Sequence, residues 1–344
     1  MASNAQVRGA LLEEAVSWLL KRVGYRVLTS SDEGVIPGGA GLEVQGRGSR
    51  HQIDSLAQFD GTPAFMYPLR LLVEAKCLKS PVGIHVVRNA VGVIKDISEN
   101  YFSFTSRATK SEIQVQRFNY HAAVFSASGF TRPAQQYAIA HQVFLIDYKD
   151  IHAIKPLVDT IKGLKIPRRS LKEPGVVSRI RSTFEAVLSG KDWDNQDAFL
   201  LHGLALDSLA DQVQSIQGSY FAMLQGRWPI HIVSRTPIPP SLFRNKDVLQ
   251  CRVWGYAGKT WSFTPLGVSQ DSDEYFRLEF ALPTVIGELV ARHSDSPLTI
   301  AEIKEEYFSY MILSGEIGGI RRTVRLVLDK EWIESYKGKV RRRN

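Results

Sequence analysis

The chain has 344 residues, 44% of them hydrophobic and 23% charged, so it is long and apolar enough to bury cores in two domains. No window approaches the roughly 18 consecutive apolar residues of a membrane span, and two cysteines are too few for a disulfide framework. We therefore expect a soluble, cytoplasmic protein with no membrane partner. The formal net charge of +8 favours a polyanionic partner, although ordinary charge for solubility explains it equally well.

Hydrophobic periodicity predicts an α/β domain in the first half of the chain. In chain order we expect a helix over 8–23, a strand over 25–29, a flexible loop over 30–41, strands over about 50–59 and 69–77, a helix over 86–97, a strand over 121–126, a helix over 133–141 and a strand over 142–146. Strand, helix and strand in this order predict a βαβ crossover, and hence a mixed sheet with helices on both faces.

A domain boundary is expected where Gly and Pro punctuate a strongly basic stretch. Residues 162–181 contain seven Lys or Arg together with Pro167, Pro174 and Gly175, a composition typical of exposed linkers. We therefore expect domains over 1–160 and 191–344, joined by a basic linker over 161–190. The second domain is predicted to be α+β, with a helix over 195–216, strands near 219–224, 229–234, 248–256, 259–264 and 275–282, and helices near 284–293, 300–311 and 315–329. A further basic run, 337–343, lies near its end.

Four polar residues fall in two neighbouring strand-like segments, Gln52 and Asp54 in the first and Glu74 and Lys76 in the second. Because side chains alternate across a strand, each pair shares one face, about 6.6 Å apart along its strand. If the two strands form a hairpin, all four side chains can converge. The charges at positions 74 and 76 interrupt an apolar run, and burying a carboxylate is costly unless something compensates its charge.

A divalent metal would supply that compensation. Mg²⁺ prefers oxygen ligands and keeps several waters, so the carboxylates of Asp54 and Glu74 and the backbone carbonyl of Ala75 would suffice beside a substrate phosphate. Lys76 would orient and help to deprotonate the attacking water and offset charge that builds on phosphorus. The pattern predicts Mg²⁺-dependent, or Mn²⁺-dependent, attack on a phosphodiester.

The spacing Gln52, Asp54, Glu74 and Lys76 resembles the PD-(D/E)xK nuclease signature, in particular the Mrr-like branch of the restriction endonucleases. The resemblance covers roughly residues 8–150. Further motifs occur in the family's order: Glu13 eleven residues before Gly24-Tyr25, Pro81-Val82-Gly83-Ile84, the strand 122–126, Gly129-Phe130-Thr131, and a strand ending in Asp147. Two features depart from the family: no proline precedes Asp54, and residues 98–118 are longer than the usual connection.

The resemblance implies a restriction-endonuclease-like fold and hydrolysis of DNA in prokaryotic defence. It implies that Glu13, on the first helix with Glu14 turned outward, joins the catalytic residues. It also implies a homo-oligomer or a partner in a defence complex, because many relatives cut both strands as dimers. The second domain would recognise substrate, sense a signal or mediate assembly.

Several readings stay open. Asp54, Glu74 and Lys76 can instead form a salt bridge across a hairpin, Gln52 can cap that hairpin, and Glu13 can be a solvated helix residue. A rival function is a non-catalytic DNA-binding or assembly protein that keeps the fold, and RNA is an alternative substrate. The basic segment is either a solvated linker or an arm that contacts phosphates through Lys165, Arg168, Arg169 and Lys172.

Overall fold

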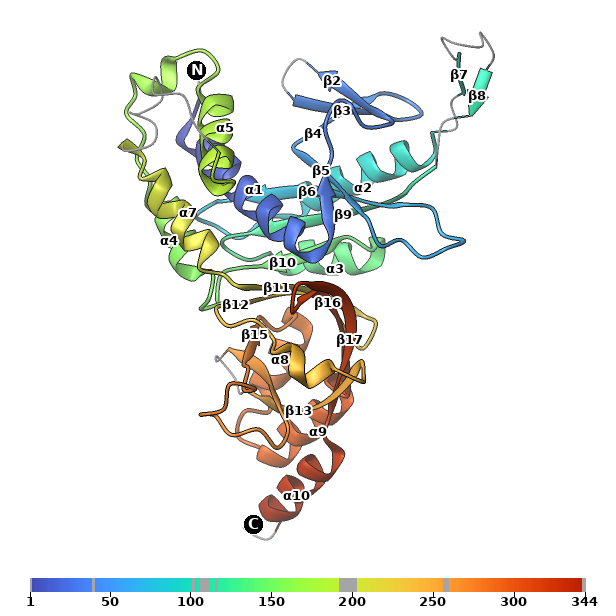
Figure 1. Ribbon diagram of the computed structural model, residues 1–344, viewed down its shortest axis with the longest axis vertical. Coiled ribbons are helices and arrows are strands. Elements are labelled where there is room, and N and C mark those ends of the chain that lie inside the picture. Colours follow the sequence, from blue (N-terminus) through green and yellow to red (C-terminus); the bar gives the residue numbers. More distant parts are fainter. Residues whose placement is uncertain are drawn as a thin grey trace. The chain divides into compact units, whose positions relative to one another are not determined.

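The computed structural model describes residues 2–38, 41–100, 103–105, 112–114, 117–191, 203–255 and 260–341 (Figure 1). The chain divides into two compact units. Unit 1 contains Met1–Ile146 and Ile161–Leu206, and unit 2 contains Asp147–Thr160 and Asp207–Asn344. Across the described ranges, no helix combines the length and apolar character needed to cross a bilayer.

Unit 1 is built on a five-stranded mixed sheet, as expected for its α/β class. Its strands are β1 (Tyr25–Val27), β5 (Ser55–Phe59), β6 (Leu69–Lys76), β9 (Asn119–Ser126) and β10 (Phe144–Asp147), in the order β1-β5-β6-β9-β10. β5 pairs antiparallel with both β1 and β6, whereas β6 pairs parallel with β9. The central strands β6 and β9 carry long buried apolar runs, as parallel strands covered on both faces do.

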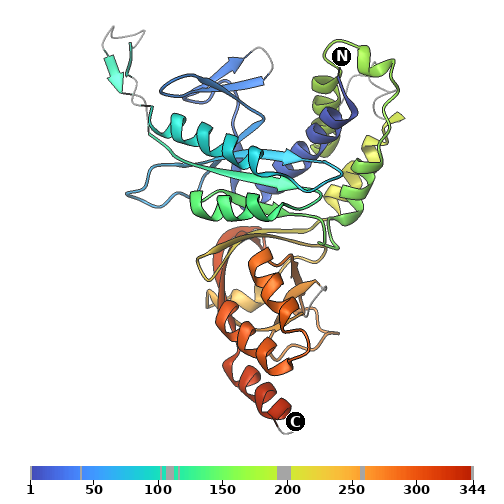
Figure 2. The same cartoon turned by 180° about the vertical axis from the view of Figure 1, so that it is seen from behind.

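Helices cover both faces of this sheet (Figures 1 and 2). α1 (Asn4–Val23) contacts β1, β5 and β6 on one face. It starts four residues earlier than expected because Ser3 and Gln6 form a capping box, and it ends at Gly24 with φ of 102°. α2 (Ile84–Ser98) and α3 (Arg132–His141) cover the other face and share a core with Leu72 of β6.

The expected single strand over 50–59 is in fact two strands in different sheets. β4 (Arg50–Ile53) joins β2 (Val35–Gly38) and β3 (Gly41–Gln45) in a separate three-stranded sheet, so part of the expected loop over 30–41 is strand. The chain bends at Asp54 before β5 enters the main sheet. This bend sets the candidate site at the junction of the two sheets. Beyond α2, β7 (Ser103–Thr105) pairs with β8 (Glu112–Gln114); much of the expected long connection over 98–118 lies outside the described residues.

Residues 161–190, expected to be a linker, contain folded structure. They follow from the end of α4 (Lys155–Gly163) through a short 3-10 helix, Ser170–Lys172, to α5 (Val176–Leu188). α5 packs against α1 and buries Val176, Ile180 and Phe184. These residues are spaced four apart, so they form one apolar stripe within an otherwise charged segment. The segment is therefore part of the body of unit 1.

Unit 2 contains a nearly closed mixed sheet of seven strands with helices, in keeping with the expected α+β class. The strands are β11 (Gly218–Leu224), β12 (Trp228–Ser234), β13 (Val248–Trp254), β14 (Trp261–Pro265), β15 (Leu278–Phe280), β16 (Tyr310–Ile317) and β17 (Ile320–Leu328), in the order β12-β11-β16-β17-β13-β14-β15. β13 and β17 are parallel, and the other pairs described are antiparallel. The end strands β12 and β15 also approach each other.

The predicted helix over 315–329 is wrong. These residues form the β16–β17 hairpin, which turns at Gly318 and Gly319 with φ of 63° and 77°. The alternating burial of Val324, Leu326 and Leu328 is that of a strand. The predicted helix over 195–216 lies partly outside the described residues; its described end forms α7 (Leu206–Gln214).

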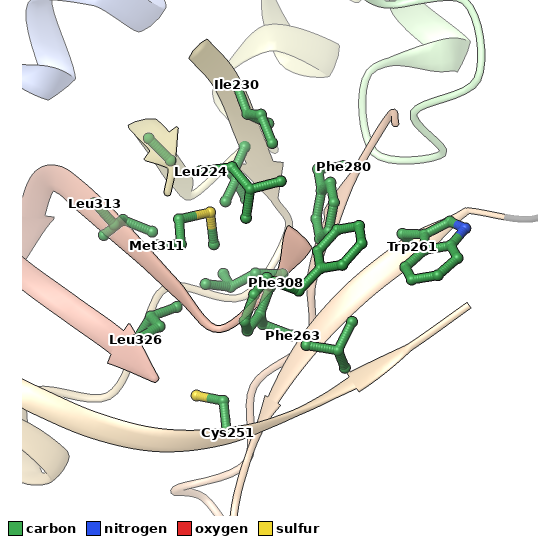
Figure 3. Packing of buried hydrophobic residues seen from close by; sticks show 14 of the residues in the cluster. Leu224, Ile230, Cys251, Trp261, Phe263, Phe280, Phe308, Met311, Leu313 and Leu326 are labelled. Atoms are coloured by element: carbon green, nitrogen blue, oxygen red, sulfur yellow. The ribbon is translucent and has the colours of Figure 1, made fainter. Parts of the chain in front are cut away.

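The core of unit 2 is rich in aromatic side chains (Figure 3). Trp261 stacks on Phe308, with ring centroids 4.8 Å apart, and Phe263 lies against Phe280. α8 (Thr284–Arg292) and α9 (Pro297–Tyr307) contribute buried residues to this core, and α10 (Lys330–Arg341) packs on α9. Both cysteines are buried and free, and Cys251 is a core residue here.

Candidate active site in unit 1

Asp54 and Glu74 lie at the same end of the β5–β6 ladder. Ser55, which follows Asp54, pairs with Val73, and Glu74 is the next residue of β6 after Val73. The two carboxylates therefore enter the same region of unit 1, and both line one pocket. Burial of Val73 and Ala75 on both sides of Glu74 fixes which face the carboxylate occupies.

Gln52, Asp54, Glu74 and Lys76 line one pocket of about 320 Å³. Its remaining wall comes from Ile53 of β4, from apolar residues of β6 and β9, and from the side of α2 that carries Asn89, Ala90 and Val93. The four polar residues that the sequence singled out therefore lie together, although Gln52 comes from the small sheet and the others from the main sheet or the bend.

Lys76 is held as a cation in this pocket. Its Nζ lies 2.5 Å from Oε1 of Glu74, and both side chains are about three-quarters buried. Burial alone would lower the pKa of Lys76, but the charge and hydrogen bond of Glu74, followed by Asp54 and Glu13, raise it above its usual value. At neutral pH Lys76 is therefore an ammonium, which can orient a water and stabilise developing negative charge but cannot accept a proton.

Glu13 approaches this group from α1. This residue is 6% exposed, and it does not line the pocket itself. A Cβ built on Gly9, one helical turn earlier, would lie 3.9 Å from the backbone oxygen of Ala75 and 4.0 Å from Oε1 of Glu13. Burial, followed by the charge of Asp54, raises the pKa of Glu13, Arg181 and Lys76 oppose the rise, and the resulting pKa is about 7. The pKa of Glu13 therefore depends on the charges of both Asp54 and Lys76.

Arg181 was not among the predicted site residues. Its Nη2 donates to Oε2 of Glu13, and its Nε lies 3.3 Å from Oε1 of Glu14. Glu14, expected to face solvent, is instead covered by α5, and burial raises its pKa to about 7. The signal that could have found this contact was the apolar spacing of Val176, Ile180 and Phe184, which predicts that α5 packs on a neighbour.

The donor set fits a hard divalent cation with few protein ligands. The described residues contain no group of three or more His, Cys, Asp or Glu side chains able to hold a metal, as a structural zinc site would require. Mg²⁺ commonly takes one or two carboxylates and completes its shell with waters and substrate oxygens. Asp54 and Glu74 line the pocket and offer those carboxylates, whereas Ala75 does not line it and its carbonyl oxygen lies near Gly9 of α1.

The basic side chains expected to contact nucleic acid lie elsewhere. Lys165, Arg168, Arg169 and Lys172 are all exposed on the segment that joins α4 to α5, and none of them lines the pocket. Their role in binding remains a prediction.

Comparison with known proteins assigns the first part of the chain. No curated protein matches this chain. A solved structure, the crystal structure of a protein of unknown function named AF1548, is 16% identical and covers 60% of this chain and 94% of its own, with a TM-score of 0.34. Residues 5–154 match the family model Mrr_cat, described as restriction endonuclease. Residues 5–154 of this chain are therefore a restriction endonuclease domain of the Mrr_cat family.

Proposed function

We propose that this protein is a metal-dependent endonuclease that hydrolyses phosphodiester bonds of DNA, in restriction or in defence of a prokaryotic cell against phage. The observation that carries the proposal is the convergence of Gln52, Asp54, Glu74 and Lys76 in one pocket of a restriction endonuclease domain. A simple salt bridge explains the Lys76–Glu74 contact, but it does not explain why Asp54 and Gln52 line the same cavity.

Asp54, Glu74 and the backbone carbonyl of Ala75 would hold Mg²⁺, with Mn²⁺ as a substitute. Such an ion acts as a Lewis acid on a phosphoryl oxygen and makes water a stronger nucleophile at neutral pH. The carboxylate of Glu74 is held on a paired strand and has little freedom to lose when the ion binds, which favours binding.

The remaining polar side chains act on the substrate and on the attacking water. The ammonium of Lys76 can orient that water and stabilise charge that develops on the phosphoryl oxygens. The amide of Gln52 can donate to a phosphate oxygen at the mouth of the pocket. Glu13, when ionised, can accept a proton or a hydrogen bond at the end of β6.

Cleavage of supercoiled plasmid tests the proposal. With Mg²⁺ or Mn²⁺ we expect nicked or linear products from the native chain, and loss of at least about a hundredfold in rate for Asp54→Ala and Lys76→Ala. Lys79→Ala, a change at an exposed lysine three residues beyond the site, is the matched control and should cut normally. Parallel assays with RNA of the same sequence decide the substrate class.

Two results would overturn the proposal. One is binding of DNA without cleavage under any divalent ion, which would support the non-catalytic alternative. The other is equal cleavage by the native chain and both site variants, which would place the activity elsewhere.

A further inference from the structure

Unit 2 exposes a row of aromatic rings where β13 meets α10. Trp254, at the end of β13, is 43% exposed, and Tyr336, on α10, is 39% exposed. Trp332, partly buried against the core, lies between them, with ring centroids 5.5 Å from Trp254 and 6.3 Å from Tyr336. We call these three residues the aromatic row. Surfaces that expose aromatic rings in succession are uncommon unless something binds them.

The row is held in place by its own contacts. Nε1 of Trp254 donates to Oγ1 of Thr264 at 2.8 Å, and the backbone NH of Trp332 donates to Oδ2 of Asp329 at 3.0 Å. The ammonium of Lys304 lies 6.0 Å from the Trp332 ring centroid. The Trp254 ring, which its hydrogen bond holds in place, loses little conformational freedom on binding a ligand, and so it suits recognition.

The far side of α10 is anchored separately. Lys337 is only 6% exposed and forms ion pairs with Glu305 of α9 and Glu334 of α10. The ion pair with Glu305 holds α10 on α9, and Tyr336 remains exposed. The part of α10 that carries the aromatic row is therefore attached to the body of unit 2.

Positive charge flanks the row at both ends. Arg252 precedes Trp254 by two residues on the same face of β13, and Lys339 follows Tyr336 by three on the same side of α10. Nε of Arg252 is buried and donates to no atom in the described part of the chain. In sequence, residues 330–344 contain six Lys or Arg and two Glu, which includes the basic run at 337–343. Residues 342–344 of this stretch lie outside the described residues.

We propose that the aromatic row, with Arg252 and Lys339, binds unpaired nucleotides of a DNA strand. Bases would stack on Trp254 and Tyr336 while the two cations contact the backbone phosphates. Aromatic rings flanked by cations are suited to a single strand, whose bases have free faces, and a paired duplex offers no such faces to an exposed side chain. The proposal rests on the proposed nuclease function, and it gives unit 2 the task of holding an unpaired part of the substrate.

Binding of labelled single-stranded DNA of about 20 nucleotides tests this surface. The full chain carrying Asp54→Ala is used in EDTA, so that binding is measured by fluorescence anisotropy without cleavage. We expect Trp254→Ala and Tyr336→Ala each to weaken binding about tenfold, and the Phe substitutions at both positions to restore most of it. Val248→Ala, at a 48% exposed apolar residue of the same strand, is the matched control and should leave affinity unchanged.

Lys339→Ala supplies an independent readout. It should reduce the dependence of the logarithm of affinity on the logarithm of salt concentration by about 0.7, the contribution of one phosphate contact on a single strand. Trp254→Phe, which keeps a ring and removes no charge, should leave that slope unchanged.

The inference fails if both alanine variants bind like the parent chain, or if duplex DNA competes as well as single-stranded DNA. It also fails if the variants change only the oligomeric state, which would make the row a contact between copies. Should Trp254→Ala not fold, Tyr336→Ala at an exposed helix position decides alone. Plasmid cleavage is scored separately, so loss of the proposed nuclease function and loss of this surface are distinguishable.

Discussion

Arg181 donates a hydrogen bond to the carboxylate of Glu13 across 168 positions of sequence. The arginine lies on α5, beyond the matched range 5–154, whereas Glu13 lies on α1 within it. The compact unit that holds the candidate site accordingly continues through α5. A chain that ends at residue 154 would lack the cation that offsets two buried carboxylates.

Replacing Arg181 should change the pH dependence of cleavage. Burial and Asp54 raise the pKa of Glu13 to about 7, and Arg181 opposes that rise. We expect cleavage by the native chain to increase with pH through about 7, as Glu13 ionises. In Arg181→Ala the opposing charge is gone, so the inflection should move up by about one pH unit; Arg181→Lys should move it less.

Arg179→Ala is the control for that experiment. Arg179 belongs to the same helix, but it pairs with Glu173 in an exposed salt bridge. Its loss should leave the pH–rate profile and the melting temperature nearly unchanged. An Arg181→Ala profile that falls in rate at every pH without shifting would mean that the arginine only supports the fold.

Glu14→Gln should stabilise the protein at neutral and alkaline pH. Burial raises the pKa of Glu14 from 4.5 to about 7, so the folded state binds a proton more tightly than the unfolded state. This group therefore lowers the free energy of unfolding as pH rises from about 4.5 to 7, by up to about 3 kcal/mol. Urea denaturation of Glu14→Gln at pH 5 and pH 8 should show a smaller difference than the native chain. An unchanged difference would show that Arg181 already compensates the carboxylate in full.

The sequence alone identified those site residues that stand out from the pattern of their own strand. Asp54, Glu74 and Lys76 stood out because charges interrupt a strand pattern, and a strand has one geometry. The bend at Asp54 was not predictable from the same pattern, because alternation continues through residues 50–59 whether they join one sheet or two. Arg181 was not predicted either: the apolar spacing around it indicates that α5 packs on a neighbour, but nothing near Arg181 in sequence specifies that this neighbour is α1.

In unit 2 the local sequence pattern was a poorer guide to the structure. The predicted helix over 315–329 is wrong because these residues form the β16–β17 hairpin, whose glycine turn interrupts the alternation of apolar residues. Pairing of β17 with β13 is parallel and long-range, so only the tertiary structure settles it.

Tyr148→Phe should destabilise unit 2 although Tyr148 belongs to a separate stretch of chain. The Tyr148 hydroxyl lies 2.6 Å from Nδ1 of His231, and Ser219 Oγ lies 2.8 Å from Nε2 of the same ring. Burial lowers the pKa of His231 to about 3, so the ring is neutral and accepts at one nitrogen while it donates at the other. Removing the hydroxyl should cost about 1–3 kcal/mol of unfolding free energy.

Urea denaturation followed by tryptophan fluorescence measures this loss. Ser219→Ala, on the other side of the ring, should cost a similar amount, and the double variant should cost less than the sum because both groups act on one imidazole. Additive losses would show that the two hydrogen bonds are independent.

Gly9 is the residue of α1 that lies next to the end of β6, and the size of the side chain placed at this position should decide whether the protein can cleave DNA. A methyl at this position would meet the backbone oxygen of Ala75 and Oε1 of Glu13 only at ordinary contact distance. Gly9→Ala should therefore keep full cleavage and raise stability by about 0.5–1 kcal/mol, because alanine favours a helix interior. Gly9→Leu places three more carbons between these oxygens and should abolish cleavage while the fold survives. Plasmid cleavage and thermal denaturation of both variants check this, and a leucine variant that cuts as fast as the native chain would place Glu13 and the Ala75 carbonyl outside the reaction.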